Sequence, residues 1–354
     1  MGFARSGLLS WPGKIRVAFE PFATRRPDDI DETIHAFAAR RIGREAADIL
    51  IDSMVSGVFG GNARELSLRA CFPKMWQMET DHGGLFRALL AKMREKKKRR
   101  GEAMGAPAGR LTSFKGGSEE LIQGVAGALD ADVRTNAWVE DIHETAEGYG
   151  VALQGGDTLT AHAVVLATGA SAAAANVASL DDGLAATLRQ IPCAPIVVAC
   201  LGWERERLGH DLDGFGFLIP RGEGPRTLGV LWDSSIYPGR APEGHVLVRV
   251  MIGGASDPDA VDLDDDTLLH IIRRDLQTTM RVDAEPSFSR IFRHRLGIPQ
   301  YRVGHGDKLA RIEARLANHP GLYVTGNSYR GVAINSCIAE AGPLAERIAS
   351  EQLQ

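Results

Sequence analysis

The N-terminal third of the chain has apolar residues at the spacing of amphipathic helices. This spacing predicts helices over 28–41 and 45–55, and a longer one that begins near Leu85 and ends in the basic run 96–100. Cations at a helix C-terminus complement its dipole, and such a run either faces water or attracts an anionic lipid surface. The segment 8–22 is interrupted by prolines and is expected to be extended and turn-rich.

The pattern changes after residue 110. An amphipathic helix is predicted to follow Ser118. Short strands are then expected over 133–142 and 149–153 and at Leu159, separated by glycines as in a meander. The near-continuous apolar run 163–169 predicts a strand that is buried on both faces.

The middle of the chain, 191–254, is rich in strands bounded by glycine and proline turns. After a helix over 264–280, the segment 286–306 is expected to be irregular, and a short helix over 308–316 leads into a strand at 322–324. The expected strands of the middle segment, paired in an antiparallel sheet, are 196–201, 214–220, 228–232 and 246–252.

The stretch 321–340 has the pattern of a buried strand, a glycine turn and a helix. Asn335 is a favoured residue for capping the start of that helix. A helix N-terminus with a glycine-bearing approach can hold an anionic ligand, but the same pattern also serves as an ordinary strand-turn-helix corner. Pro343 removes a hydrogen bond inside the helix and therefore predicts a kink or break near Gly342.

The composition is that of a globular chain long enough for two domains. Its 354 residues are 44% hydrophobic and 24% charged, and the net charge of −4 does not indicate nucleic-acid binding. The four cysteines form no Cys-x-x-Cys pair, so we expect no disulfide framework, no metal site and a reducing, cytoplasmic location. No apolar run is long enough to span a membrane, which leaves a peripheral location on the inner membrane open.

Five runs along the chain together resemble one family, the oxygen-dependent protoporphyrinogen oxidases. Members of this family are similar in fold to the amine-oxidase flavoenzymes, bind FAD, and oxidise a porphyrinogen to a porphyrin with oxygen as electron acceptor. The runs cover nearly the whole chain in order: SGVFGGN at 56–62 with ELS at 65–67, FKGG at 114–117, GFGFLIP at 214–220, IPQY at 298–301 with GH at 304–305, and GN at 326–327 with YRGV at 329–332 and NSC at 335–337.

The resemblance implies a set of FAD contacts. The backbone of Val139 would meet the adenine end of the cofactor. The backbones of Val332, Ala333 and Ile334 would lie against the flavin ring near its N1–O2 edge, where the following helix would stabilise the negative charge of the reduced flavin. His294 stands where relatives often carry a tryptophan that packs near the flavin.

By the same resemblance, Gly57, Phe215, Leu218 and Met251 would line a substrate pocket over the flavin. Such a pocket suits a tetrapyrrole, which is large, flat and apolar with carboxylates at one edge. Without the resemblance, the three larger residues are equally compatible with an ordinary sheet core.

No catalytic residue is assigned from the sequence. His143, His294 and His305 are candidate proton acceptors by residue type, but a lone histidine is more often structural. The flavin carries the hydride chemistry, so the protein is expected mainly to position the substrate.

The expected fold class is α/β with α+β character: an incomplete Rossmann-like FAD-binding domain, an inserted antiparallel-sheet substrate domain and a helical subdomain. The strands before Gly169 and Gly326 both end in glycine turns, and the sheet between them forms a separate layer. The predicted domains are a helical, membrane-associated and substrate subdomain over 1–110, the middle segment of the FAD-binding domain over 111–180, the antiparallel-sheet substrate domain over 181–292, and the C-terminal segment of the FAD-binding domain over 293–354.

The chain departs from the family because it contains no G-x-G-x-x-G motif, the loop that grips the pyrophosphate of FAD. Without that βαβ unit, the strands that end at Thr168 and Val324 would expose apolar edges. Three explanations are open. The chain is a fragment of a complete enzyme, or a separate polypeptide completes it, or it is a non-catalytic remnant that binds a tetrapyrrole or nothing.

The expected function is FAD-dependent oxidation of protoporphyrinogen IX to protoporphyrin IX in heme biosynthesis, with oxygen as acceptor. The alternatives are another amine-oxidase-like flavoprotein and a truncated, non-catalytic tetrapyrrole-binding protein. Expected partners are a porphyrinogen, oxygen, a membrane surface, and either a second copy of the chain or a separate chain that carries the dinucleotide motif. Protoporphyrinogen and coproporphyrinogen both fit these residues.

Overall fold

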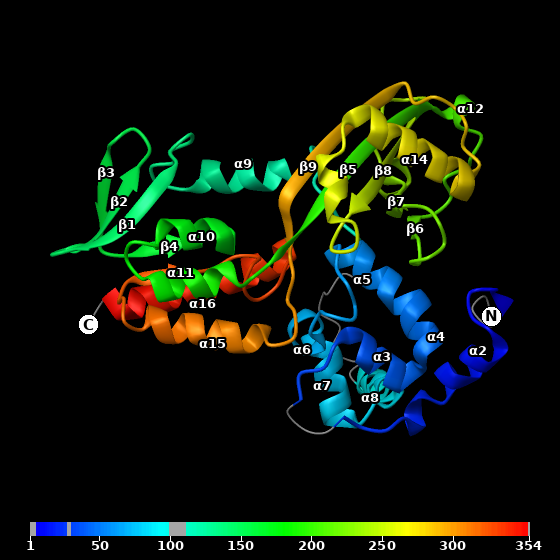
Figure 1. The fold of residues 1–354 in the computed structure, drawn as a ribbon, viewed down its shortest axis with the longest axis horizontal. Helices are drawn as coiled ribbons and strands as arrows, with labels where there is room; N and C mark the ends of the chain where they lie inside the picture. The colour runs from blue at the N-terminus through cyan, green and yellow to red at the C-terminus, as the bar shows by residue number, and fades with distance from the viewer. Residues whose placement is uncertain (1–4, 27–29, 99–110, 353–354) are drawn as a thin grey trace.

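The computed structural model describes residues 5–26, 30–98 and 111–352 (Figure 1). Three parts are visible: a group of N-terminal helices, a five-stranded sheet with helix α14 (Asp265–Met280) on one face, and an α/β part built from middle and C-terminal residues. The mixed helix and sheet class predicted from the sequence is therefore confirmed. None of the helices in these ranges is long and apolar enough to cross a bilayer.

The N-terminal group begins with helix α2 (Trp11–Ala18), where the sequence predicted an extended entry. Pro12 lies in the first turn of α2, where its missing N–H costs no hydrogen bond, and the Ser10 side chain accepts the N–H of Gly13 at 3.1 Å. The prediction is wrong because this proline starts a helix instead of breaking one. The other helices of the group are η1 (Glu20–Phe22), α3 (Ile34–Ile42), α4 (Arg44–Ala46), η2 (Ala47–Ile51), α5 (Asp52–Phe59), α6 (Leu68–Cys71), α7 (Pro73–His82) and α8 (Leu85–Lys98).

The predicted helix 28–41 corresponds to α3, which begins at Ile34, whereas Asp28 lies outside the described residues. The predicted helix 45–55 is part of a longer run, α4–η2–α5, that contains a π-helical turn. The basic run 96–100 lies outside the residues whose side chains are described. The core between these helices contains Ile34, Phe37, Val55, Phe59, Ala63, Leu66 and Leu68.

A buried ion-pair network holds the N-terminal helices together. Arg41 is fully buried, and its Nε donates to Glu20 Oε1 at 2.8 Å. A second carboxylate, that of Glu79, lies 3.4 Å from the same guanidinium. Glu20 also accepts the backbone N–H groups of Leu85 (2.9 Å) and Phe86 (3.1 Å), which begin α8. One carboxylate thus both neutralises Arg41 and caps α8, so it fixes α8 against η1 and α3.

The five-stranded sheet is antiparallel, with strand order β6-β7-β8-β5-β9. Its first four strands confirm those expected between residues 191 and 254. The last strand contradicts the prediction that 286–306 is irregular, because polar and charged residues suit an edge strand that pairs on one side with β5. The strands are β5 (Cys193–Glu204), β6 (Gly216–Leu218), β7 (Thr227–Leu231), β8 (His245–Gly253) and β9 (Phe288–Pro299), with short helical turns α12 (Arg205–Leu208), α13 (Asp233–Ile236) and η3 (Pro258–Asp262).

The α/β part contains two small sheets. β1 (Val139–Thr145), β2 (Gly148–Leu153) and β3 (Thr158–Ala161) form an antiparallel meander, and β4 (Val164–Leu166) pairs in parallel with β10 (Leu322–Val324). Val165 is 41% exposed, so the expectation that β4 is buried on both faces is wrong: the described residues leave one face uncovered. The helices here are α9 (Glu119–Ala128), α10 (Ala170–Asn176), α11 (Asp182–Arg189), α15 (His305–Leu316) and α16 (Ile334–Gln352).

Helix α16 differs from its prediction at both Asn335 and Pro343. It begins at Ile334, so Asn335 lies inside the first turn instead of capping it. It then continues to Gln352 with Pro343 inside, so the predicted break near Gly342 is wrong. Both Pro343 and Ala339, whose carbonyl the proline leaves without an N–H, are exposed, so water can solvate that carbonyl.

We expect Glu20→Ala to lower the free energy of unfolding by about 3–5 kcal/mol, because it removes the Glu20 carboxylate that pairs with the buried Arg41 guanidinium and caps α8. Urea denaturation followed by far-UV circular dichroism measures this. Glu285→Ala is the matched control: its ion pair with Arg273 is at the surface, and its loss should cost less than about 1 kcal/mol. Equal losses from both variants would contradict the role given to Glu20.

Candidate functional site

The turn between β10 and α16 presents the residues expected at the flavin. Val332 packs against an apolar cluster that contains Val55 and Phe59 of α5. Ala333 and Ile334, by contrast, are exposed. The turn thus leaves its last two residues accessible at the positive end of the α16 dipole.

Tyr301 holds this turn at both ends. Its hydroxyl donates to Asn327 O at 2.6 Å and accepts from Gly331 N at 2.8 Å. Burial raises the pKa of the Tyr301 hydroxyl, so the group stays protonated and keeps its donor. Gly331 has φ +148°, a conformation that side chains disfavour, and this lets its N–H reach the hydroxyl.

His305 adds a third contact to the turn. Its ring stacks on Tyr301 with centroids 4.1 Å apart, and its Nε2 lies 2.8 Å from Tyr329 O. A carbonyl only accepts, so Nε2 carries the proton. Burial lowers the pKa of His305, which keeps the imidazole neutral at pH 7. His305 therefore supports the turn and is too deeply buried to act as a base on a substrate.

Val139, the residue expected at the adenine, begins β1 in the three-stranded sheet of the α/β part. Its carbonyl accepts a hydrogen bond from Asn176 Nδ2 at 2.7 Å, which fixes β1 against α10. Its role as an adenine contact stays a prediction.

The expected substrate residues gather on the face of the five-stranded sheet opposite α14, called the open face below. Leu218, Gly229, Met251, Val198 and Phe292 pair in register across the five strands. Directly paired residues project from the same face of a sheet, so these five form one row. This apolar row contains two of the predicted pocket residues, Leu218 and Met251, and two apolar side chains that the sequence did not single out, Val198 and Phe292.

Other predicted residues border the apolar row. Gly57 of α5 faces Leu218 so closely that a Cβ at position 57 would lie 2.4 Å from Leu218 Cδ2. His294 follows Phe292 by two positions on β9, so it projects from the same face, and it is exposed. Phe215 precedes β6 and is 61% exposed.

Helix α5 joins the two groups of predicted residues. Through Val55 and Phe59 it supports the cluster to which Val332 belongs, and through Gly57 it faces Leu218 on the open face. The expected flavin turn and the expected substrate residues therefore lie against the same helix.

A second row crosses the open face beside the apolar row. Arg249, Cys200 and Arg290 pair in register on β8, β5 and β9. Arg249 donates to the buried carboxylate of Asp233 at 2.8 Å, and the Arg290 guanidinium lies over the ring of Phe292, 5.1 Å from its centroid. Burial raises the pKa of the Cys200 thiol, so it stays protonated beside these cations.

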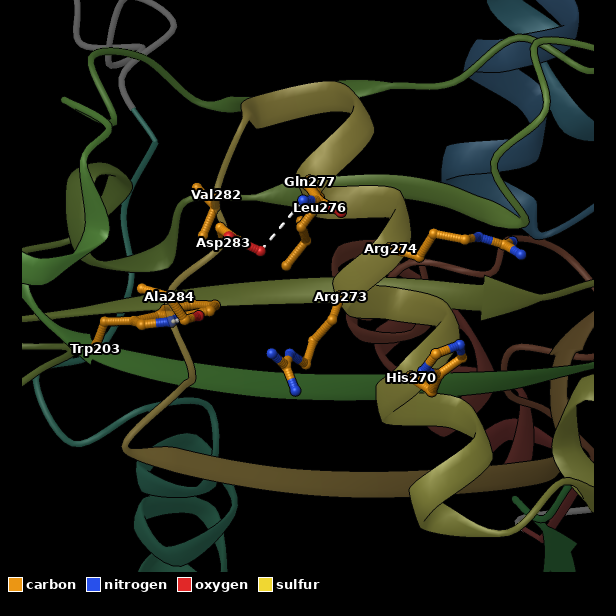
Figure 2. Close-up of a pocket in the computed structure, with 9 residues that line it drawn as sticks. All are labelled: Trp203, His270, Arg273, Arg274, Leu276, Gln277, Val282, Asp283 and Ala284. Carbon is orange, nitrogen blue, oxygen red and sulfur yellow. Dashed lines mark hydrogen bonds between the residues drawn. The ribbon is translucent and has the colours of Figure 1, made fainter.

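A recess of about 310 Å³ lies on the other side of the sheet, against α14 (Figure 2). Trp203 Nε1 donates to Ala284 O at 2.9 Å, and Gln277 donates to Asp283 at 3.2 Å, across this recess. Trp203 belongs to the core between the sheet and α14. The sheet itself therefore separates the recess from the open face, and none of the residues predicted for the site lines it.

The histidines do not supply an evident proton acceptor. His143 lies on β1, about half exposed, 3.5 Å from Asp141. His305 is buried in the turn, and His294 lies on the open face with its side chain exposed. Within the described ranges, no group of histidine, cysteine, aspartate and glutamate side chains is arranged to hold a metal ion.

Sequence reasoning assigned no role to Tyr301, Phe292 and Arg290. Tyr301 belongs to the IPQY run, but its hydroxyl contacts residues that are 26 and 30 positions away. Phe292 and Arg290 lie in the segment expected to be irregular. The aromatic and branched residues Phe288, Ile291 and Phe292 were the signal for β9, but arginines on both faces hide the period-two alternation.

Comparisons with known proteins agree with the motif runs. The family model described as flavin containing amine oxidoreductase matches residues 2–349. A coproporphyrinogen III oxidase from Bacillus subtilis is 29% identical over 95% of this chain and 71% of its own length. Protoporphyrinogen oxidase 1, chloroplastic, from Spinacia oleracea is 30% identical over 94% of this chain and 63% of its own length.

A solved structure shows the same fold. It is a crystal structure of a protein from Exiguobacterium sp. 255-15 that is described as a protoporphyrinogen oxidase by similarity, with a TM-score of 0.83 and 25% identity over 99% of this chain and 74% of that one. The chain thus spans 63% to 74% of the length of these proteins. The resemblance found in the sequence is confirmed, and the chain belongs to the flavin-containing amine oxidoreductases, a family of oxidoreductases.

Proposed function

We propose that the chain serves FAD-dependent oxidation of a porphyrinogen to a porphyrin in heme biosynthesis, with protoporphyrinogen IX as substrate and oxygen as acceptor. The observation that carries the proposal is the open face, where an apolar row and a row with two arginines lie side by side. A flat tetrapyrrole with carboxylates at its edge matches that combination. The names of the relatives, porphyrinogen oxidases from a bacterium and a plant, support the same substrate class.

The turn before α16 fits the flavin end of FAD. Ala333 and Ile334 are exposed at a helix N-terminus, whose partial positive charge favours an electron-rich reduced ring. Gly331 keeps the turn tight, since a Cβ there would lie 2.4 Å from Ser336 Cβ. When bound, FAD supplies the hydride acceptor and passes electrons on to oxygen.

The chain's own residues would orient the substrate. Leu218, Met251 and Phe292 offer a continuous apolar surface that would cover one face of the macrocycle and exclude water from it. His294 lies at the border of this surface, where it would pack near the flavin. No residue is assigned as acid or base, so positioning is the contribution that we propose for the protein.

The pyrophosphate of FAD needs a further element, because no G-x-G-x-x-G motif occurs in the 354 residues. Two surfaces of the α/β part suit a βαβ unit. β4 has a strand partner on one side, β10, and α9 exposes its apolar face, with Ile122 66% exposed and Val125 and Leu129 also open to water. We propose that a βαβ unit, from a longer form of the chain or from a separate polypeptide, adds a strand beside β4.

The missing motif also favours a second candidate function. A chain without a pyrophosphate loop could bind a tetrapyrrole on the open face without catalysing its oxidation. A third candidate, another amine-oxidase-like flavoprotein with a different apolar substrate, would use the same turn. Turnover of porphyrinogens against other apolar substrates separates the third candidate from the first.

A peripheral membrane location is proposed from the N-terminal helices. Trp11, Ile15, Phe19 and Phe22 are spaced as one helical stripe along α2 and η1, and Trp11 and Phe22 are 71% and 79% exposed. A second exposed set of apolar residues, Phe86, Leu89, Leu90 and Met93, lies on the neighbouring α8, with basic residues between its members. Aromatic stripes with basic neighbours suit the interface of an anionic bilayer, whereas pairing of two copies of the chain is the competing use.

The first test is the flavin absorbance of the purified chain after FAD is added in excess and removed. The proposal expects stoichiometric retention only when a βαβ unit is supplied, for example the corresponding segment of a relative added as a separate polypeptide. Porphyrinogen oxidation by that complex, followed through porphyrin fluorescence, completes the test. A folded complex that binds porphyrin but retains no FAD would leave the non-catalytic candidate instead.

Tyr301→Phe is expected to weaken FAD binding by about tenfold, because it leaves Asn327 O and Gly331 N without their buried partner. Titration of flavin fluorescence measures the affinity, and hydrogen exchange of the Gly331 amide reports the turn without any cofactor. Tyr329→Phe is the matched control, since its hydroxyl is equally buried but has no hydrogen-bond partner in the described residues. Equal Gly331 exchange in the two variants would contradict the role of Tyr301.

The double variant Trp11→Ser/Phe22→Ser is expected to bind vesicles at least about tenfold more weakly than the unaltered chain, because each aromatic side chain is worth roughly 1.5–3 kcal/mol when buried. Cosedimentation with phosphatidylcholine vesicles that contain phosphatidylserine measures this. Leu296→Ser, at an equally exposed apolar position on β9, is the control. A monomer–dimer change without any vesicle effect would assign the stripe to self-association.

A further inference from the structure

Arg290 is a cation on the open face that forms no ion pair within the described residues. Of the two arginines in the second row, Arg249 is engaged by the buried carboxylate of Asp233 at 2.8 Å. Arg290 has no carboxylate partner in the described part of the chain, and its guanidinium lies over the ring of Phe292. The charge of Arg290 is therefore uncompensated on this face.

The position of Arg290 is set by the register of the sheet. It pairs with Cys200, as Phe292 pairs with Val198, so both side chains of β9 project from the open face. Residues two apart on a strand are separated by about 6.6–6.8 Å, and the guanidinium reaches back over Phe292, 5.1 Å from its centroid. The positive charge of Arg290 thus lies at the edge of the apolar row, next to where the rim of a flat ligand on that row would lie.

We propose that Arg290 binds a carboxylate of the tetrapyrrole and thereby sets the preference between substrates with few and with many carboxylates. This inference rests on the proposed function and adds to it a residue that determines specificity. The planar guanidinium can pair with a carboxylate through two hydrogen bonds while it keeps its stacking on Phe292. Arg249 cannot serve equally, because a new carboxylate would have to compete with Asp233.

The edge position also explains why the number of carboxylates should matter. The apolar row can bury a macrocycle whatever its side chains are, but a carboxylate directed over the row would lose its water without gaining a partner. Arg290 supplies that partner at one border. A ligand with carboxylates around its whole rim, such as coproporphyrin III, therefore depends on Arg290 in more orientations than protoporphyrin IX, which has carboxylates at one edge.

The test is equilibrium binding of the two product porphyrins, coproporphyrin III and protoporphyrin IX, followed by their absorbance shift and by quenching of protein fluorescence. Arg290→Gln is expected to weaken coproporphyrin III binding by about tenfold, the effect of losing a charge-assisted hydrogen bond, and protoporphyrin IX binding by clearly less. Arg290→Lys should restore part of the affinity. The salt dependence of coproporphyrin III binding should fall in Arg290→Gln.

Arg295→Gln is the matched control. Arg295 lies on the same strand but projects from the other face, where it pairs with Asp262 at the surface, so its loss should leave both affinities unchanged. Binding of both porphyrins by the unaltered chain with no difference between Arg290→Gln and Arg295→Gln would overturn this inference and leave the proposed function standing. Failure of the unaltered, folded chain to bind either porphyrin would overturn both.

Discussion

Two consecutive residues, Gln300 and Tyr301, hold the three parts of the molecule together. Gln300 donates from its backbone N to Pro192 O at 2.8 Å and from Nε2 to Phe59 O, also at 2.8 Å, so it ties the entry of β5 to the end of α5. The Tyr301 hydroxyl then bonds both ends of the turn before α16, including Gly331 N. Gln300 and Tyr301 are themselves buried, and the loss of either side chain leaves backbone groups such as Phe59 O and Gly331 N without this hydrogen-bond partner. The relative position of the end of α5, the entry of β5 and the turn before α16 therefore depends on this dipeptide.

The open face follows from the alternation of strand residues. One set of side chains packs on α14 through residues such as Trp203 and Leu276, which closes that face of the sheet. Among the described residues, the alternate set, with Met251 and Phe292, has no helix as long as α14 over it; α5 approaches at Gly57, and the short helix α13 approaches through Asp233. A half-exposed apolar row is unfavourable in water and gains free energy when a flat ligand covers it, whereas the core face gains nothing further. The sheet thus has one structural face and one face suited to binding.

Much of this could be predicted from the sequence, and the failures have physical causes. Helices such as α14 and the strands β5 to β8 have clear apolar periods, so their existence and order follow directly. β9 was missed because this edge strand carries charges on both faces, such as Arg290 and Arg293, and they hide the apolar alternation that would mark a strand. The start of α2 was missed because Pro12 acts differently at the first turn than inside a helix. The hydrogen bonds of the Tyr301 hydroxyl to both ends of the turn before α16 join residues far apart in the sequence, so no local sequence pattern predicts them.

The exposed apolar surfaces differ in kind, and the difference bears on which proposed ligand each surface suits. On the open face, the backbone of the central strands is already paired, so a ligand there gains no backbone hydrogen bonds. The face therefore suits a flat apolar ligand that packs on its side chains. Beside β4, by contrast, the described residues leave strand backbone unpaired on one side, and another polypeptide segment can supply the missing strand. A parallel sheet of two strands is also too small to be stable by itself. Under the proposed function, the substrate surface would lie within the described residues, whereas a unit that pairs with β4 would complete the cofactor surface.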